Sequence, residues 1–172
     1  PVDLGEVVDA CAWQTPLAVT QPRLLALRAD GSLGLLGSRE RPEIEEISGA
    51  IRIACGSNVG IALLGDGTCR AFPVSAADLE KDVWGQRILS DVPTWTEVVA
   101  IAAGDRHVVG LRSTGQALGS GDDGGGRSSI PPESSGRVIA IGAEAANTRL
   151  YCLADGREKE LSILRNGKDD AT

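Results

Sequence analysis

A short turn that ends in Gly recurs four times along the chain, and this recurrence limits what the chain can fold into. The turns are Asp30-Gly31, Asp66-Gly67, Thr114-Gly115 and Asp155-Gly156, and the steps between their Gly residues are 36, 48 and 41. Periods of this size are typical of proteins built from stacked structural repeats. The chain is therefore predicted to contain four related units.

An apolar run precedes each turn. The second and third units read AIRIACG (50–56) and VVAIAAG (98–104), and in both the run ends 11 residues before the Gly of the turn. The fourth unit has VIAIG (138–142), and the first, loosest unit has VVDAC (7–11). A short apolar run such as VVAIAA predicts a strand that is buried on both faces.

The residues around each turn predict a hairpin. In the second unit the strands are expected at Val59–Leu64 and Thr68–Phe72, and in the third at His107–Arg112 and Gln116–Gly119. Asp-Gly supplies the positive φ of a tight two-residue turn. Each unit then becomes a small antiparallel sheet, which must pack on its neighbours to bury its faces.

One domain is expected over residues 1–164, followed by a polar tail at 165–172. Its units are predicted at about 7–37, 50–73, 98–121 and 138–161, with an insertion at 74–97. Within the insertion, Ser75 is a candidate N-cap for one short helix that runs to Asp82. The predicted fold class is therefore all-β, with one helix between two units.

Composition excludes several classes of protein. The 172 residues carry 17 Lys and Arg against 24 Asp and Glu, a net charge of −7, and 42% are hydrophobic. These values argue against disorder and against non-specific nucleic-acid binding. Apolar runs all fall short of the ~18 residues that span a bilayer. Because the chain starts at Pro1 and has no Met, a processed, trimmed or partial chain is expected.

The cysteines give little support for a metal site. They stand at positions 11, 55, 69 and 152, without a CxxC spacing, and the chain has one His. Zinc, and cofactors in general, are therefore not expected. Cys55 and Cys69 flank the second hairpin and could form a bridge, but two buried thiols are the default interpretation.

Residues 98–126, VVAIAAGDRHVVGLRSTGQALGSGDDGGG, resemble the repeat of the regulator of chromosome condensation family. The matching positions are Ala102, Ala103, Gly104, His107, Leu111, Gly115 and Gly121. The second unit keeps Gly56, Leu63, Asp66 and Gly67 but has Val59 where the family has His. The resemblance implies a β-propeller with about four strands per blade.

The length departs from a full ring of this family. Seven blades would have about 25 residues each, whereas four units have about 43, close to the ~40–50 of propeller repeats. We therefore expect a partial or compact propeller. An open arc exposes sheet edges and apolar faces, which predicts a partner chain or self-association.

Few residues in the sequence suggest a catalytic or ligand-binding role. His107 could act as a general base, but the resemblance implies a structural histidine. The stretch from Gly121 to Arg127 lacks the pattern of a phosphate loop or a calcium loop and is interpreted as a flexible linker. An acidic cluster is interpreted as a solvated linker rather than a pair of catalytic carboxylates; it comprises Glu40, Glu43, Glu45 and Glu46.

Aromatic residues are candidates for partner contacts. Trp84, Trp95 and Trp13 could anchor an interface or fill gaps between units. The remaining notable positions are expected to be structural turn or repeat residues: Gly31, Gly67, Gly104, His107, Gly115 and Gly156.

The predicted function is a non-catalytic protein–protein interaction module. Its more specific form is a peripheral accessory subunit of a larger assembly, such as a photosystem or another organellar membrane complex, in a processed chloroplast protein that does not itself span the membrane. The alternative is a regulator of an enzyme, because the resemblance implies nucleotide-exchange factors and β-lactamase inhibitors among the relatives. The insertion at 74–97 is then the candidate active element.

Overall fold

The computed structural model describes residues 6–13, 23–36, 42–74, 81–124, 126–130, 136–144, 147–154 and 157–163. Within them lie four antiparallel sheets of three strands each, and in each sheet the strand order follows the chain. The strands are β1 (Val7–Trp13), β2 (Arg23–Arg28), β3 (Leu33–Leu36), β4 (Ala50–Cys55), β5 (Val59–Leu64), β6 (Cys69–Pro73), β7 (Val98–Ala103), β8 (His107–Arg112), β9 (Ala117–Gly121), β10 (Val138–Glu144), β11 (Asn147–Ala154) and β12 (Arg157–Ile163). The all-β prediction is confirmed.

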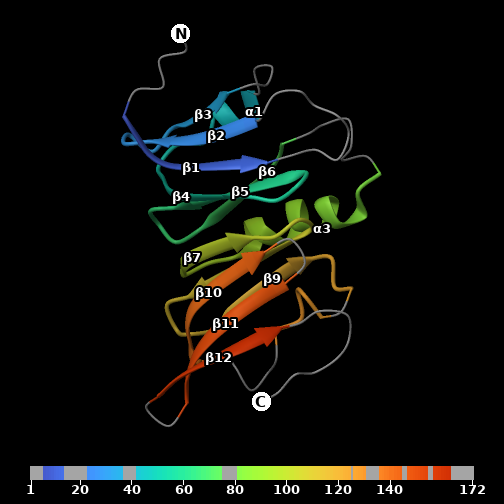
Figure 1. Cartoon of the computed structure of the whole chain (residues 1–172). Coiled ribbons are helices and arrows are strands. Elements are labelled where there is room, and N and C mark those ends of the chain that lie inside the picture. The colour runs from blue at the N-terminus through green and yellow to red at the C-terminus, as the bar shows by residue number, and fades with distance from the viewer. Residues whose placement is uncertain are drawn as a thin grey trace.

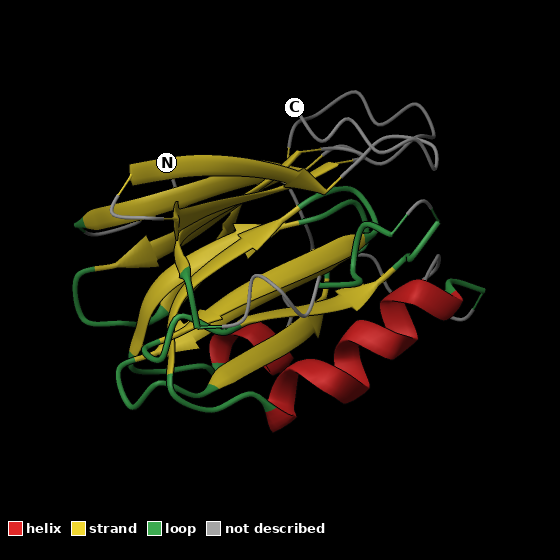
Figure 2. Ribbon diagram, turned by 90° about the horizontal axis from the view of Figure 1, so that it is seen from below, coloured by secondary structure: helices red, strands yellow, loops and turns green. Residues whose placement is uncertain are grey.

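The sheets follow one another like the blades of a propeller, with the β1–β3 sheet at one end and the β10–β12 sheet at the other (Figure 1). The first strands of consecutive sheets contact each other, β1 with β4, β4 with β7 and β7 with β10. The four sheets do not close into a ring. Figure 2 shows the strands layered over one another with helices against one side.

The hairpin turns differ from the expected two-residue form. In the second unit, Leu64 N donates to Thr68 O and Gly67 N donates to Leu64 O, which leaves Gly65, Asp66 and Gly67 as a three-residue loop. The first and third units repeat both bonds around Gly31 and Gly115. The left-handed Gly, at φ +79 to +81°, adds the extra residue, as in a type I turn followed by a bulge. Asp155 and Gly156 lie outside the described residues.

These turn glycines also join the units. The carbonyl of each one accepts a hydrogen bond from the first residue of the next sheet: Gly31 from Ala50, Gly67 from Val98, and Gly115 from Val138. A Cβ on Gly31 would lie 3.0 Å from the Cα of Gly49. Gly therefore satisfies two demands at these positions, a left-handed backbone and a close inter-sheet contact.

The strands that are buried on both faces are not the predicted ones. The middle strands β5 and β8 are buried at five consecutive residues, whereas β7 is buried only at Val98 among its six. Middle strands have a neighbouring strand on each side and a packed sheet on each face. The first strands lie at the edge of their sheets, so part of each apolar run remains exposed.

Three apolar clusters join the consecutive sheets. The first packs Leu25, Leu27 and Ile53 between the first two sheets, and the second packs Ile61, Leu63 and Val108 between the next two. The third is smaller and centres on Leu111 and Leu150. The core is thus a series of interfaces between sheets, as stacked repeats require.

The described part of the insertion contains a helix, and this helix lies after the predicted one. Helix α3 (Val83–Asp91) starts after Asp82, whose Oδ1 accepts from Trp84 N, and the 3-10 helix η1 (Val92–Thr94) follows directly. Residues 75–80 lie outside the described part of the chain. A further short helix, α1 (Pro42–Glu45), lies where a linker was expected and buries Ile44.

Candidate functional site

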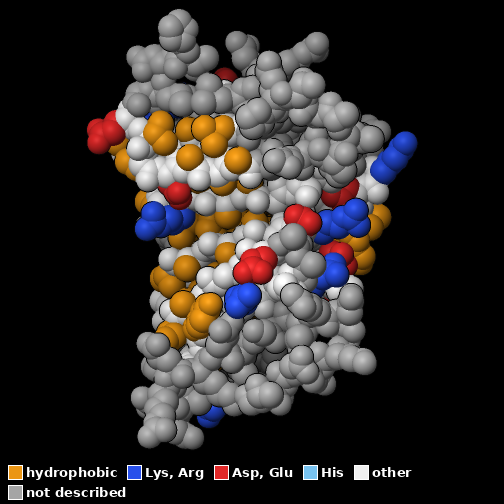
Figure 3. All heavy atoms as spheres, viewed as in Figure 1, with side chains coloured by type: hydrophobic (Ala, Val, Ile, Leu, Met, Phe, Trp, Pro, Cys, Tyr) orange, Lys and Arg blue, Asp and Glu red, His pale blue; other side chains and the backbone are white. Residues whose placement is uncertain are grey.

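A row of exposed aliphatic side chains follows the first strands of all four sheets. The row consists of Val8 (56% exposed), Ile51 (53%), Val99 (55%) and Ile139 (44%). Figure 3 shows hydrophobic side chains gathered over β1 and over β7 and β10 on one face. Other parts of the described surface also expose large apolar residues, but without this repetition.

A β-bulge places each member of the row. The pairing of first and second strands shifts register at Val7/Asp9, Ala50/Arg52, Val98/Ala100 and Val138/Ala140, so in every unit the row residue is the extra one. A bulge leaves its extra residue unpaired and re-aims its side chain. Four bulges at equivalent positions therefore direct four β-branched side chains to solvent.

A groove of about 540 Å³ lies within the row, between the third and fourth units. Val99 and Ile139 line it together with Leu111 and Val138, and the turn at Ser113–Gly115 forms one wall. Arg112 and Arg137 contribute charge at its edge. The groove is thus an apolar hollow with a basic rim.

The three tryptophans that were predicted as candidate anchors do not share one environment. Trp95 is buried (6% exposed) in the cluster between the second and third sheets, where a Cβ on Gly110 would lie 2.9 Å from its ring. Of its two interpretations, the structure supports the gap-filling one. Trp84 is half-buried on α3, while the side chain of Trp13 lies outside the described residues.

His107 is a buried residue at the junction of the third and fourth units. It is 1% exposed, and a Cβ on Gly104 would overlap its ring and the carbonyl of Glu144. Burial lowers the pKa of His107, and a backbone contact with Asn147 opposes this shift. Within the described residues, neither ring nitrogen makes a hydrogen bond of good geometry.

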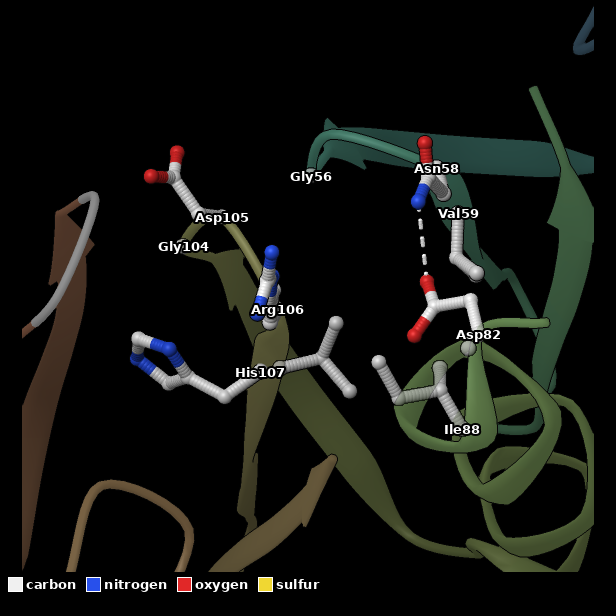
Figure 4. A pocket seen from close by; sticks show the side chains of 11 residues that line it. Gly56, Asn58, Val59, Asp82, Ile88, Gly104, Asp105, Arg106 and His107 are labelled. Atoms are coloured by element: carbon white, nitrogen blue, oxygen red, sulfur yellow. Dashed lines mark hydrogen bonds between the residues drawn. The ribbon is translucent and has the colours of Figure 1, made fainter. Parts of the chain in front are cut away.

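The cavity beside His107 has no room for a substrate. Its volume is about 10 Å³, at most the space of one water molecule. Asn58 Nδ2 donates to Asp82 Oδ2 across 2.9 Å on one side, while the imidazole of His107 points away from this pair (Figure 4). The arrangement does not bring a base, an acid and a substrate space together.

The Gly-rich stretch after β9 is organised by two aspartates, where a flexible linker was predicted. Arg127 Nη1 donates to Asp122 Oδ2 at 2.8 Å, and Gly124 N donates to the other oxygen of Asp122. Ser128 and Ser129 bond to Asp123. Burial raises the pKa of Asp123, but these bonds outweigh it and lower the pKa. The repeated Gly and Ser letters concealed this network.

The cysteine pairing differs from the predicted alternatives. Cys11 on β1 and Cys55 on β4 form a disulfide between the first two sheets. Cys69 is a free buried thiol whose pKa burial raises to about 11. Cys55 cannot reach it because β5 lies between their strands. Cys152 is also free and buried.

The acidic cluster is solvated where it can be described. Glu45 and Glu46 are exposed, and Glu40 and the side chain of Glu43 lie outside the described residues. No group of three or more His, Cys, Asp or Glu in the described ranges could hold a metal ion. In the same ranges, no helix has the length and apolar character needed to cross a membrane.

Sequence reasoning missed the row of bulges. Its trace is visible in the printed sequence, because the second letter of each apolar run is Val or Ile: Val8, Ile51, Val99 and Ile139. In the second unit, alternation counted back from the buried Ile53 would place Ile51 inside, whereas the register shift between Ala50 and Arg52 leaves Ile51 and Arg52 both exposed.

Residues 98–127 match the model of the regulator of chromosome condensation (RCC1) repeat. No curated protein matches the chain in sequence. The predicted resemblance is thus confirmed for the third unit, from β7 through β9 and the aspartate-bonded loop.

Solved structures share the fold at low sequence identity. The ectodomain of the receptor kinase CR4 from Physcomitrella patens is 15% identical with a TM-score of 0.58, over 81% of this chain and 39% of that one. The CRINKLY WD40 ectodomain of the Arabidopsis thaliana receptor kinase ACR4 is 17% identical with a TM-score of 0.53, over 83% and 45%. Human WBSCR16 is 14% identical with a TM-score of 0.53, over 86% and 45%.

The chain spans less than half the length of these structures. Identities of this size establish the fold and not the activity. The third unit of this chain therefore matches the RCC1 repeat, and the four units together share the fold of β-propeller blades.

Proposed function

We propose that the chain is a non-catalytic protein–protein interaction module that binds its partner through the row Val8, Ile51, Val99 and Ile139. The observation that carries this proposal is the fourfold repetition of an exposed β-branched residue at a bulge. One such side chain on a surface is ordinary, but an aligned set is typical of an interaction site.

The energetics favour a partner that covers the row. Burying a whole Val or Ile side chain stabilises a complex by roughly 1.5–3 kcal/mol, so covering four that are about half exposed contributes roughly 3–6 kcal/mol before the costs of association. Exposed charged residues beside the row, such as Arg52 and Arg137, provide a polar rim. An apolar centre with a charged rim is the usual anatomy of a protein interface.

Two structures of the same fold are ectodomains of receptor kinases, which is compatible with a binding role. A finer version of the proposal makes this chain a peripheral accessory subunit of a larger assembly. Its placement in an organellar complex such as a photosystem rests on the character of the repeats in the sequence. The alternative, regulation of an enzyme through the insertion, has less support because α3 packs against β6 and β9 in the core.

Native mass in an extract of the source tests the function. Wild-type chain is expected to migrate in a complex, and Val99→Asp or Ile51→Asp is expected to lose most of that complex. Val83→Asp is the matched control, because Val83 is 63% exposed on α3 and lies outside the row. Trp84→Ala tests the tryptophan in the same assay.

The proposal is wrong if the row variants keep the complex and the control loses it. A complex that depends on Trp84 but not on Val99 would place the interface on α3. Circular dichroism of every variant would show that a lost complex does not reflect a lost fold.

A further inference from the structure

We propose that the row binds a second copy of this chain, in an antiparallel two-fold arrangement. This inference rests on the proposed function, because it assumes that the row is a protein-binding surface. The charges beside the row and the shape within it favour a second copy as the occupant.

The charges beside the row alternate in sign from unit to unit. Glu6, Glu97 and Arg137 stand two residues before the row residue of the first, third and fourth units, and Arg52 follows that of the second. All four residues are exposed, and none makes an ion pair within the described residues. The order of these four charges along the row is therefore negative, positive, negative, positive, and Arg112 is a further cation at the groove of the third unit.

A two-fold axis across the row places opposite charges together. The first unit then faces the fourth unit of the second copy, so Glu6 meets Arg137, and the second unit faces the third, so Arg52 meets Glu97. Each pair occurs twice in such an isologous interface. A parallel arrangement would instead place like charges opposite each other, which electrostatics disfavours.

The shape of the row, like its charges, is complementary to itself under the two-fold axis. The groove of about 540 Å³ lies between the third and fourth units. In the antiparallel arrangement it faces the first and second units of the other copy, which present Val8 and Ile51. Two aliphatic side chains therefore enter an apolar groove, and the symmetry repeats this contact on the other half.

Sedimentation equilibrium with charge-exchange variants tests the arrangement. Wild-type chain is expected to form a species of twice 17.8 kDa as its concentration rises. Arg52→Glu and Glu97→Arg are each expected to weaken dimerisation about tenfold or more, because each change places like charges together twice. The double variant exchanges the two signs and is expected to restore most of the affinity.

Arg70→Glu serves as the matched control, because Arg70 is exposed on the third strand of its sheet, β6, away from the row. It is expected to leave dimerisation unchanged. The pair Glu6→Arg and Arg137→Glu repeats the test at the two ends of the row.

A mass of 17.8 kDa at all concentrations would overturn the second-copy proposal, as would a double variant no better than its singles. The proposed function has a separate readout. If the chain is monomeric but its complex in the source extract still depends on Val99, the row binds another protein. If neither the mass nor the complex responds to the row variants, both proposals are wrong.

Discussion

Different structures fill the gap between the second and third sheets and the gap between the third and fourth sheets. Between the second and third sheets, α3 and η1 insert Ile88 and Val92, with Trp95 directly after them. Between the third and fourth, the loop after β9 lies against Gly119, and Thr148 Oγ1 donates to the carbonyl of Arg127 at 2.8 Å. The buried apolar face of a helix and a polar loop thus fill two successive gaps between sheets.

The two gaps share a close approach to a glycine but differ in the residues that fill them. In both gaps a Gly on the neighbouring sheet leaves room for the filler, Gly110 for Trp95 and Gly119 for Ser128. Both glycines belong to the third sheet, Gly110 on β8 and Gly119 on β9, so each filler approaches that sheet at a different strand. An apolar filler stabilises the fold through burial, whereas a polar filler stabilises it through ion pairs and hydrogen bonds.

The largest expected effect is at the gap that the helix fills. Trp95→Ala should lower the free energy of unfolding by about 3–5 kcal/mol, because it removes a buried aromatic side chain and leaves a cavity over Gly110. Urea denaturation would measure the change. Trp84→Ala, at a half-buried position, is the control and should cost less; equal losses would contradict the assignment of Trp95 to the core.

The polar loop should depend on its aspartate. Asp122→Ala should lower stability by about 2–3 kcal/mol, because it leaves the guanidinium of Arg127 without the carboxylate that it contacts at 2.8 Å. The comparison variant is Asp105→Ala, at an exposed carboxylate. Thermal unfolding of both would decide, and a loss no larger than that of the control would show that the pair does not hold the loop.

Stability should fall as the pH drops from 7 to 5. Burial lowers the pKa of His107 in the folded chain, so the unfolded chain takes up a proton at its ordinary pKa of 6.5 before the folded chain does. The stability from the neutral ring is complete above pH 6.5 and is lost below it, by at most about 1.4 kcal/mol per pH unit.

His107→Val, which copies Val59 of the second unit, should flatten this dependence. Denaturation at several pH values would measure it. The chain has one His, and the lowered pKa values of Asp30, Asp66 and Asp123 act below this range. If His107→Val kept the wild-type dependence of stability on pH, that dependence would not come from His107.

The smallest effect is expected at a turn. Glu97 has φ +57°, whereas Gly49 occupies the corresponding position with φ +71°. Glu97→Gly should raise stability by up to about 1 kcal/mol by relieving left-handed strain, measured by denaturation at low protein concentration. Gly49→Ala, with nothing within 4 Å of the added Cβ, should lower it by about 1 kcal/mol. A Glu97→Gly variant less stable than wild type would contradict this account.

The sequence predicted the repeats because their determinants are local. Strands β5 and β8 fall at the predicted residues, since apolar β-branched residues and the following Gly turn define them within a dozen positions. Other features depend on contacts between residues that are far apart in the sequence. The Cys11–Cys55 pairing depends on which first strands become neighbours, and the exposure of both Ile51 and Arg52 depends on a register shift. Neither can be deduced from the residues of one unit alone.

Side-chain footprinting of the assembled protein shows directly whether the partner covers the row. Labelling of Val8, Ile51, Val99 and Ile139 would be compared between the isolated single chain and the chain in its native complex, with Val83 as the reference. Labelling is expected to fall at the four row residues and to stay constant at Val83. Protection of Val83 and Trp84 with an unprotected row would contradict it.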